Sequence, residues 1–278
     1  MSTVTTADRP TGRPTPSPLR LGLRRATIEL KQFFRQRDSM VFIFAFPVIL
    51  LFIFGSVFSD EIAPDVTFSQ YFVAGMLASG LMATGFQSLA IQIPIERDDG
   101  TLKRLDGTPL PRSAYFVGKV ALVAVTMVCQ AAILLVVGAA LFGLEMPSEP
   151  GRWLTFAWLT VLGSAAFTLL GIAFSSVPRS GRSAPAVVSP IALVLQFISG
   201  VFFVYSQLPG WMQQVAALLP LKWLTQGMRS VFLPDSFAAS EPAGGWEHGR
   251  IALVLTAWVV VGAVLAVRTF RWRRRDDG

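Results

Sequence analysis

The sequence predicts an all-α membrane protein: six transmembrane helices, an N-terminal interfacial amphipathic helix and a short re-entrant helix pair before the last span. The chain of 278 residues is 53% hydrophobic and only 15% charged, whereas a soluble domain has about 25% charged residues. Several apolar runs also approach the length of about 20 residues that a helix needs to cross a bilayer. Lipid is therefore the expected solvent for most of the chain.

Six apolar segments make up a predicted transmembrane domain over residues 38–267. None has Asp, Glu, Lys or Arg in its apolar centre, and each is long enough for a hydrocarbon core of about 30 Å. The third is too long for one straight crossing, so its first turns are expected to protrude. The segments are residues 40–58, 71–93, 114–144, 153–174, 184–205 and 251–267.

The distribution of Lys and Arg predicts the orientation in the membrane. With the N-terminus inside, the cytoplasmic segments hold about 20 of the 24 basic residues, as the positive-inside rule requires. Both termini and the charged stretch around Glu96 are then cytoplasmic.

The two ends of the chain differ in character. Residues 1–18 are rich in Pro, Thr and Ser, so we expect a disordered tail. Residues 19–37 place Leu23, Ala26 and Phe33 on one helical face and basic residues on another, which favours an amphipathic helix in the inner interface. A solvated basic arm is the alternative. Residues 268–278 form a basic tail suited to anionic lipid.

Small residues mark the second span. Gly80, Thr84 and Ser88 recur at four-residue spacing, which allows close helix packing in lipid. We therefore place this span deepest in the protein. The pattern fits ordinary packing at least as well as the lining of a pathway.

Residues 207–233 are expected to form two short outer helices, neither long enough to cross the bilayer. Pro220 separates them, and Trp211 and Trp223 are predicted at headgroup depth. Such a pair is tolerated in a membrane only where protein shields its backbone.

Several kinds of chemistry are absent. The sequence has no P-loop motif for nucleotide. With one histidine and one cysteine, a His-rich metal site and an intrachain disulfide are excluded. Basic residues lie at span ends rather than on a domain face, which argues against nucleic acid. We predict no catalytic residue, no metal site and no cofactor in this chain, so any energy for transport comes from another chain.

A charged stretch, "IERDDGTLKRLDGTPLPRSAYFVGK", lies between the second and third spans. Gly100 is expected to end one helix and Thr101 to cap a short new one. Leu102 and Leu105 then share one side of that helix. Residues 95–112 would form a compact cytoplasmic turn suited to a protein surface. From the residues alone, a solvated loop whose charges only set topology is an equal alternative.

This stretch resembles the signature of ABC-2-type transporter permeases. The matching residues are Glu96, Arg97, Gly100, Thr101, Leu102, Leu105, Thr108, Pro109 and Lys119. A second match lies in "LPGWMQQVAALLPLKWLTQGMRS", through Leu208, Pro209, Trp211, Pro220 and Arg229. Asp106 and Gly107 depart from the family pattern, which more often has apolar or small residues there.

The resemblance implies a half-permease whose two copies form a pathway above two separate ATPase subunits, which bind the ATP and Mg²⁺. Among family members, the chain is most similar to bacterial drug exporters of the daunorubicin-resistance type, which implies a location in the plasma membrane. The family's substrates include drugs, lipids and lipid-linked glycans. The implied ATPase-coupling residues are Glu96, Arg97, Gly100, Thr101, Leu102, Lys103, Leu105, Thr108 and Pro109. The implied pathway residues of the second and fifth spans are Gly80, Thr84, Gln87, Gln196 and Phe197, and the outer helix pair is marked by Pro209, Trp211, Pro220 and Arg229.

Two rival functions remain open on the sequence. One is a non-transporting membrane scaffold or sensor, and the other is a passive channel. An ATPase encoded beside the gene would favour the exporter over both.

Overall fold

The structure, a computed structural model, describes residues 17–58, 60–108 and 110–272. Residues 1–16 of the predicted disordered tail over 1–18, Pro109, and residues 273–278 of the basic tail lie outside these residues. Pro18 is already the first residue of a helix. Within the described part the chain is helical apart from one small antiparallel hairpin, which agrees with the predicted all-α class.

The helices follow the order of the predicted segments, with the hairpin between the first and second. The elements are α1 (Pro18–Arg35), α2 (Arg37–Val57), β1 (Glu61–Ala63), β2 (Val66–Thr67), α3 (Phe68–Met82), the π-helix η1 (Ala83–Gln87), α4 (Ser88–Asp98), α5 (Thr101–Asp106), α6 (Arg112–Phe142), α7 (Pro150–Phe174), α8 (Ala184–Ile198), η2 (Tyr205–Gln207), α9 (Gly210–Ala217), α10 (Pro220–Phe232), η3 (Asp235–Ser240) and α11 (His248–Thr269).

Four helical segments of the described chain are long and apolar enough to cross a membrane. Two further predicted spans appear as the shorter apolar helices Ile43–Val57 and Ala184–Ile198. Several apolar helices of this kind are typical of a multi-pass membrane protein. The four long segments are Phe68–Asp98, Arg112–Phe142, Pro150–Phe174 and His248–Thr269.

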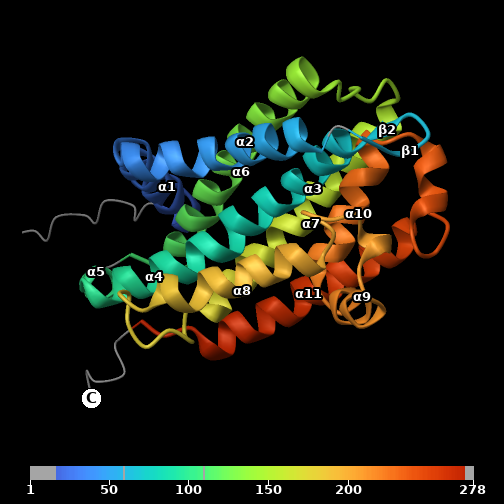
Figure 1. The fold of residues 1–278 in the computed structure, drawn as a ribbon. Helices are drawn as coiled ribbons and strands as arrows, with labels where there is room; N and C mark the ends of the chain where they lie inside the picture. Colours follow the sequence, from blue (N-terminus) through green and yellow to red (C-terminus); the bar gives the residue numbers. More distant parts are fainter. Residues whose placement is uncertain (1–16, 59, 109, 273–278) are drawn as a thin grey trace, which may run out of the picture.

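The segment Phe68–Asp98, here called the central span, joins α3, η1 and α4 into one helical path. Of its most apolar window, 83% is buried inside the protein, against 22–44% for the other three long segments. Figure 1 shows α3 and α4 in the middle of the bundle, between α2 and α8. The prediction that the second span lies deepest is confirmed.

Small residues let other backbones approach the central span closely. A Cβ added at Gly75 would lie 3.1 Å from the carbonyl oxygen of Val201. A Cβ at Gly171 of α7 would lie 2.5 Å from the carbonyl oxygen of Gly85, inside the π-helix. In lipid such close approach supplies the dispersion energy that holds helices together, so these glycines serve packing.

The fifth predicted span is shorter than expected. The sequence predicts a helix over 184–205, but α8 ends at Ile198. Gly200 takes a left-handed conformation with φ +74°, which only glycine adopts without strain. The carbonyl freed at Ser199 accepts a hydrogen bond of 2.8 Å from the Thr225 hydroxyl, so protein shields the broken backbone as lipid requires.

The apolar face predicted for α1 is divided between the protein and the surroundings. Ala26 and Phe33 are buried against the protein, whereas Leu23 is 56% exposed. The buried side also includes Glu29. A Cβ at Gly22 would lie 2.7 Å from Val117 of α6, so α1 and α6 cross closely, and the apolar residues on the exposed face of α1 are left for lipid.

We expect Gly171→Ala to destabilise the fold because its methyl group would press on the backbone of Gly85. Forced overpacking of this kind costs about 1–3 kcal/mol. The matched control is Gly151→Ala in the same helix, where an added Cβ meets nothing within 4 Å. Thermal unfolding in detergent should show a lower midpoint for Gly171→Ala only. Equal midpoints for the two variants would contradict the close crossing of α7 and the central span.

Candidate functional site

The turn between the central span and α6 lies at one end of the bundle, where Figure 1 shows α5 near the loop that precedes α8. α4 ends at Asp98, Gly100 has φ +77°, and α5 begins at Thr101. The cap differs from the predicted one. Thr101 is the first helical residue rather than the cap, and its N–H donates to the Asp99 carboxylate at 2.9 Å.

The surface of the turn is charged, whereas its apolar side faces inward. Leu102 is fully buried and Leu105 half-buried, so Leu102 fastens α5 to its own chain and is not offered to a partner. Lys103, Arg104 and Thr108 are exposed. The exposed part of the predicted docking surface is therefore polar.

Glu96 also points inward, into a group here called the Lys119 ion cluster: Arg25, Glu29, Glu96, Tyr115 and Lys119. The Lys119 Nζ lies 3.0 Å from Glu29 Oε2 and contacts Glu96 Oε1. The Tyr115 hydroxyl donates to the other Glu96 oxygen at 2.8 Å, and Arg25 pairs with Glu29 at 2.5 Å. Two carboxylates thus balance two cations at a site where the Lys119 side chain has no exposure to solvent.

Two further residues tie the end of α4 to distant segments. The Arg97 guanidinium donates to the carbonyl oxygens of Ser175 at 3.2 Å and Arg271 at 3.1 Å. The Asp98 carboxylate accepts the N–H of Gly181 at 2.7 Å. The base of the turn is therefore fixed to the ends of α7 and α11 and to the loop before α8.

The predicted pathway residues divide into two groups. Gln196 of α8 accepts a hydrogen bond of 2.7 Å from Ser79, and Gln87 reaches Ser189 of α8 at 3.4 Å. These contacts join the central span to α8. Gly80 instead faces Gln130 of α6, because an added Cβ would lie 3.0 Å from it.

Neither Thr84 nor Phe197 takes part in the two hydrogen bonds between the central span and α8. Thr84 is buried, and its hydroxyl donates to the carbonyl oxygen of Gly80 at 2.8 Å. Phe197 is 41% exposed on α8, with its ring 4.9 Å from that of Phe202. The structure thus brings Gln87 and Gln196 to one helix boundary and leaves Gly80, Thr84 and Phe197 outside it.

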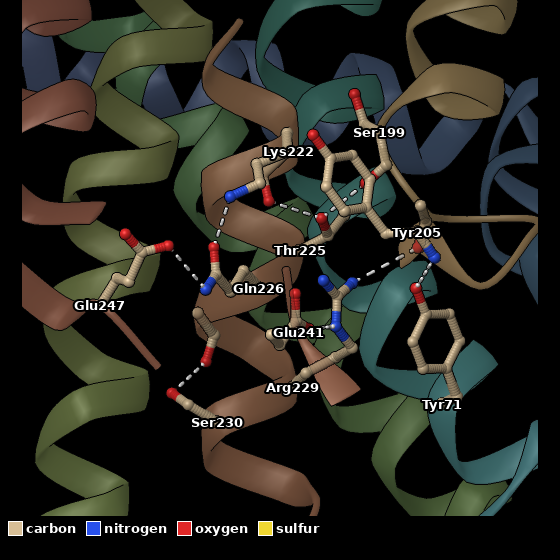
Figure 2. Close-up of polar contacts among 12 residues, drawn as sticks. Tyr71, Ser199, Tyr205, Lys222, Thr225, Gln226, Arg229, Ser230, Glu241 and Glu247 are labelled. Carbon is tan, nitrogen blue, oxygen red and sulfur yellow. Dashed lines mark hydrogen bonds and ion pairs between the residues drawn. The ribbon is translucent and has the colours of Figure 1, made fainter. Parts of the chain in front are cut away.

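At the other end of the bundle, α10 buries a row of polar side chains, shown in Figure 2. The row consists of Lys222, Thr225, Gln226, Arg229 and Ser230. Their spacing puts them on one helical face. A helix that buries so many polar groups needs partners for them. Some partners lie within α10, as for Lys222 and Gln226, and others lie on surrounding segments.

Arg229 is the centre of this row and is fully buried. Its Nε lies 2.6 Å from Glu241 Oε1, and its Nη1 donates to the carbonyl oxygen of Gly200 at 3.5 Å. The guanidinium also lies 4.9 Å from the centre of the Tyr71 ring. The Tyr71 hydroxyl accepts the N–H of Tyr205 at 3.0 Å, so Arg229 and Tyr71 together hold the start of α3 against the non-helical segment after α8 (Figure 2).

Sequence reasoning selected Arg229 but missed Glu241 and Tyr71. One signal was available: a charged residue in an apolar segment requires a partner of opposite charge. Trp223, predicted at headgroup depth, is 6% exposed and donates to the carbonyl oxygen of Ala217 at 2.7 Å, so its ring packs inside the protein. Trp211 is 62% exposed.

The prolines of the outer pair stand at helix starts. Pro209 precedes α9 and Pro220 is the first residue of α10, where its missing N–H costs no hydrogen bond. Lys222 follows, with its Nζ 2.6 Å from Gln226 Oε1 and 3.6 Å from the Trp223 ring centre. Burial lowers the pKa of Lys222 to about 8, so this cation is held by the amide and the ring rather than by water.

Among the described residues, no group of three or more His, Cys, Asp or Glu could hold a metal ion. The arrangement at both ends is one of fixed charges between helices.

Comparison with known proteins gives a consistent picture. The ABC-2 type transporter family matches residues 26–233 of the chain. The putative transport permease ycf38 of Porphyra purpurea is 23% identical over 82% of this chain and 80% of its own length. The putative transport permease YvfS of Bacillus subtilis is 19% identical over 71% and 79%. The probable multidrug ABC transporter permease YbhR of Escherichia coli is 23% identical over 60% of this chain and 45% of its own.

We expect Lys119→Met to destabilise the protein strongly, because Glu29 and Glu96 would lose their shared cation. Removing one partner of a buried ion pair costs about 3–5 kcal/mol. The control is Lys31→Met, an exposed position on α1, which should change stability by less than about 0.5 kcal/mol. Thermal unfolding in detergent measures both. The double variant Glu29→Gln/Lys119→Met should recover part of the lost stability. An unfolding midpoint that Lys119→Met leaves unchanged, with no gain in the double variant, would contradict the ion cluster.

Proposed function

Because the chain belongs to the ABC-2 type transporter family, we propose that it is the membrane-spanning permease subunit of an ATP-driven exporter. A separate ATPase subunit binds the nucleotide and docks on the turn of residues 95–112. Two permease copies form the pathway. The substrate is hydrophobic or amphiphilic: a drug, a lipid or a lipid-linked glycan.

One observation supports coupling through this turn above all. The turn presents exposed Lys103 and Arg104, while the residues at its base are fixed to other helices. A partner that displaces α5 therefore moves α4 with it, and α4 continues through η1 into the central span. Motion produced outside the membrane would reach the middle of the bundle by a continuous helix.

The proposed membrane arrangement has six crossings in a bacterial plasma membrane, with both termini cytoplasmic. Helix α8 and the apolar part of α2, Ile43–Val57, supply the two crossings beyond the four long segments. A helix shorter than the hydrocarbon core is accommodated by local thinning of the bilayer. After α8, the side chains of Thr225 and Arg229 donate hydrogen bonds to carbonyl oxygens of the non-helical backbone. Helices α9 and α10 form the outer pair.

The proposed class of substrate follows from the spans themselves. Their centres have no Asp, Glu, Lys or Arg, so a strongly ionic cargo would find no counter-charge there. The contacts between the central span and α8 are made by neutral amides and hydroxyls. The word "multidrug" in the name of the Escherichia coli relative agrees with an apolar or amphiphilic cargo.

The double variant Lys103→Glu/Arg104→Glu should weaken binding of the ATPase encoded beside the gene by at least about tenfold, since like charges facing each other across an interface cost several kcal/mol. Binding and stimulated ATP hydrolysis are measured with purified subunits. The control is Arg268→Glu, an exposed residue at the end of α11. Unchanged binding and stimulation in the double variant would refute docking on α5, and a scaffold or sensor would show no stimulation with the wild-type chain.

Orientation is tested by cysteine labelling in a chain with Cys129→Ala. A cysteine at Lys103 should react with an impermeant maleimide only in inverted vesicles. A cysteine at Ser236, exposed in η3, should react only in intact cells. The opposite pattern would place α5 outside and remove the basis for coupling.

A further inference from the structure

Three long helices leave a groove on the outer side of the bundle. α6, α7 and α11 enclose about 710 Å³ there, which lies within the range of about 300–1,000 Å³ typical of ligand sites. The groove is open to the surroundings, since Val161 is 65% and Val267 85% exposed. Its walls are mostly apolar and include Val120, Ala124, Val161, Ile172, Ala263 and Val267.

The groove extends over about one leaflet. It begins at Arg112 and Trp272, at the start of α6 and just after α11, and reaches Val161 and Ser164 near the middle of α7. From Arg112 to Ala124 a helix rises about 18 Å. Half of a hydrocarbon core of about 30 Å plus the headgroup region needs a similar length, so the groove matches one acyl chain with its headgroup.

The two ends of the groove differ in polarity. At its mouth the Arg112 side chain is 66% exposed and lies 3.1 Å from Asp106. Its guanidinium lies 5.3 Å from the centre of the Trp272 ring. A guanidinium has five N–H donors, more than one carboxylate accepts, and it binds phosphate in a bidentate fashion. Arg268, exposed near the end of α11, adds positive charge at the same end.

Aromatic rings frame this mouth. The rings of Phe116 and Phe270 lie 4.9 Å apart, and that of Trp272 lies 5.3 Å from Phe270. Aromatic rings favour the headgroup level of a bilayer, which places Arg112 at the depth of lipid phosphates and the apolar walls at the depth of acyl chains.

We infer that this groove binds one anionic phospholipid, with an acyl chain along α6, α7 and α11 and its phosphate at Arg112. None of the residues that line the groove belongs to the central span or to α8, so the lipid is a bound component rather than the cargo. It covers the inner half of α11, the least buried of the four long segments, and packs that helix against α7.

The test uses the full-length chain in nanodiscs, with a tracer of phosphatidylglycerol that has a diazirine on its acyl chain. After photolysis, peptides of α6, α7 and α11 should contain most of the label, and an equivalent phosphatidylcholine tracer should label them less. Arg112→Gln should lower the label from phosphatidylglycerol about fivefold, since one basic side chain at the surface contributes about that factor. Arg179→Gln, exposed in the loop before α8, is the control.

A second pair of variants fills the groove without touching its charge. Ala124 and Ala132 are both exposed on α6, but only Ala124 lines the groove. Ala124→Trp should abolish labelling at the groove, whereas Ala132→Trp should leave it unchanged. Label spread evenly over all spans, or equal labelling by both tracers in every variant, would overturn the inference in favour of ordinary solvating lipid.

Another outcome would also overturn it. If a second copy of the chain covers the groove, a cysteine at Val267 would form a disulfide between copies and the lipid label would be missing. No ATPase is needed in any of these measurements, so their failure would leave the proposed transport function unaffected.

Discussion

The buried Lys119 is the constraint on which the end of the bundle next to α5 depends. An ammonium group without solvent is tolerated only with carboxylates in contact, and these come from Glu29 on α1 and Glu96 on α4. The three helices therefore cannot separate without leaving a charge unpaired in a dry environment. Because Glu96 lies at the base of the turn of residues 95–112, the position of α5 depends on the same ion cluster.

Arg229 performs the equivalent task at the opposite end of the central span. Its pairing with Glu241 and its contact with Tyr71 fix the beginning of α3, as the Lys119 ion cluster fixes the end of α4. Between these two ends the central span meets α8 through two hydrogen bonds between neutral side chains, and it contains the π-helix η1. The charged contacts of the central span are thus at its ends, and its contacts with α8 in the middle are hydrogen bonds between neutral groups.

The sequence was informative wherever a feature is local. Apolar runs located the helices, small residues placed the second span deepest, and the position of Gly100 indicated a helix end. It was uninformative for contacts between distant residues. Glu29 and Lys119 are 90 residues apart, and Glu29 lies on a strongly basic helix, where one acid is easily read as a surface charge. Gly200 ends α8 through its positive φ, yet it is one of 23 glycines.

The turn that resembles the family signature combines two kinds of residue. Glu96, Arg97 and Leu102 contact their own chain, and Lys103 and Arg104 face outward. Since loss of an anchoring residue would shift α5 as well as any docked partner, a defect in coupling after its removal cannot separate a lost contact from a lost shape. Charge reversal on the outward residues leaves the anchors in place. The two groups therefore have distinct physical roles, the first giving the turn its rigidity and the second its surface. In the proposed coupling, such a rigid turn would let force at α5 reach the central span.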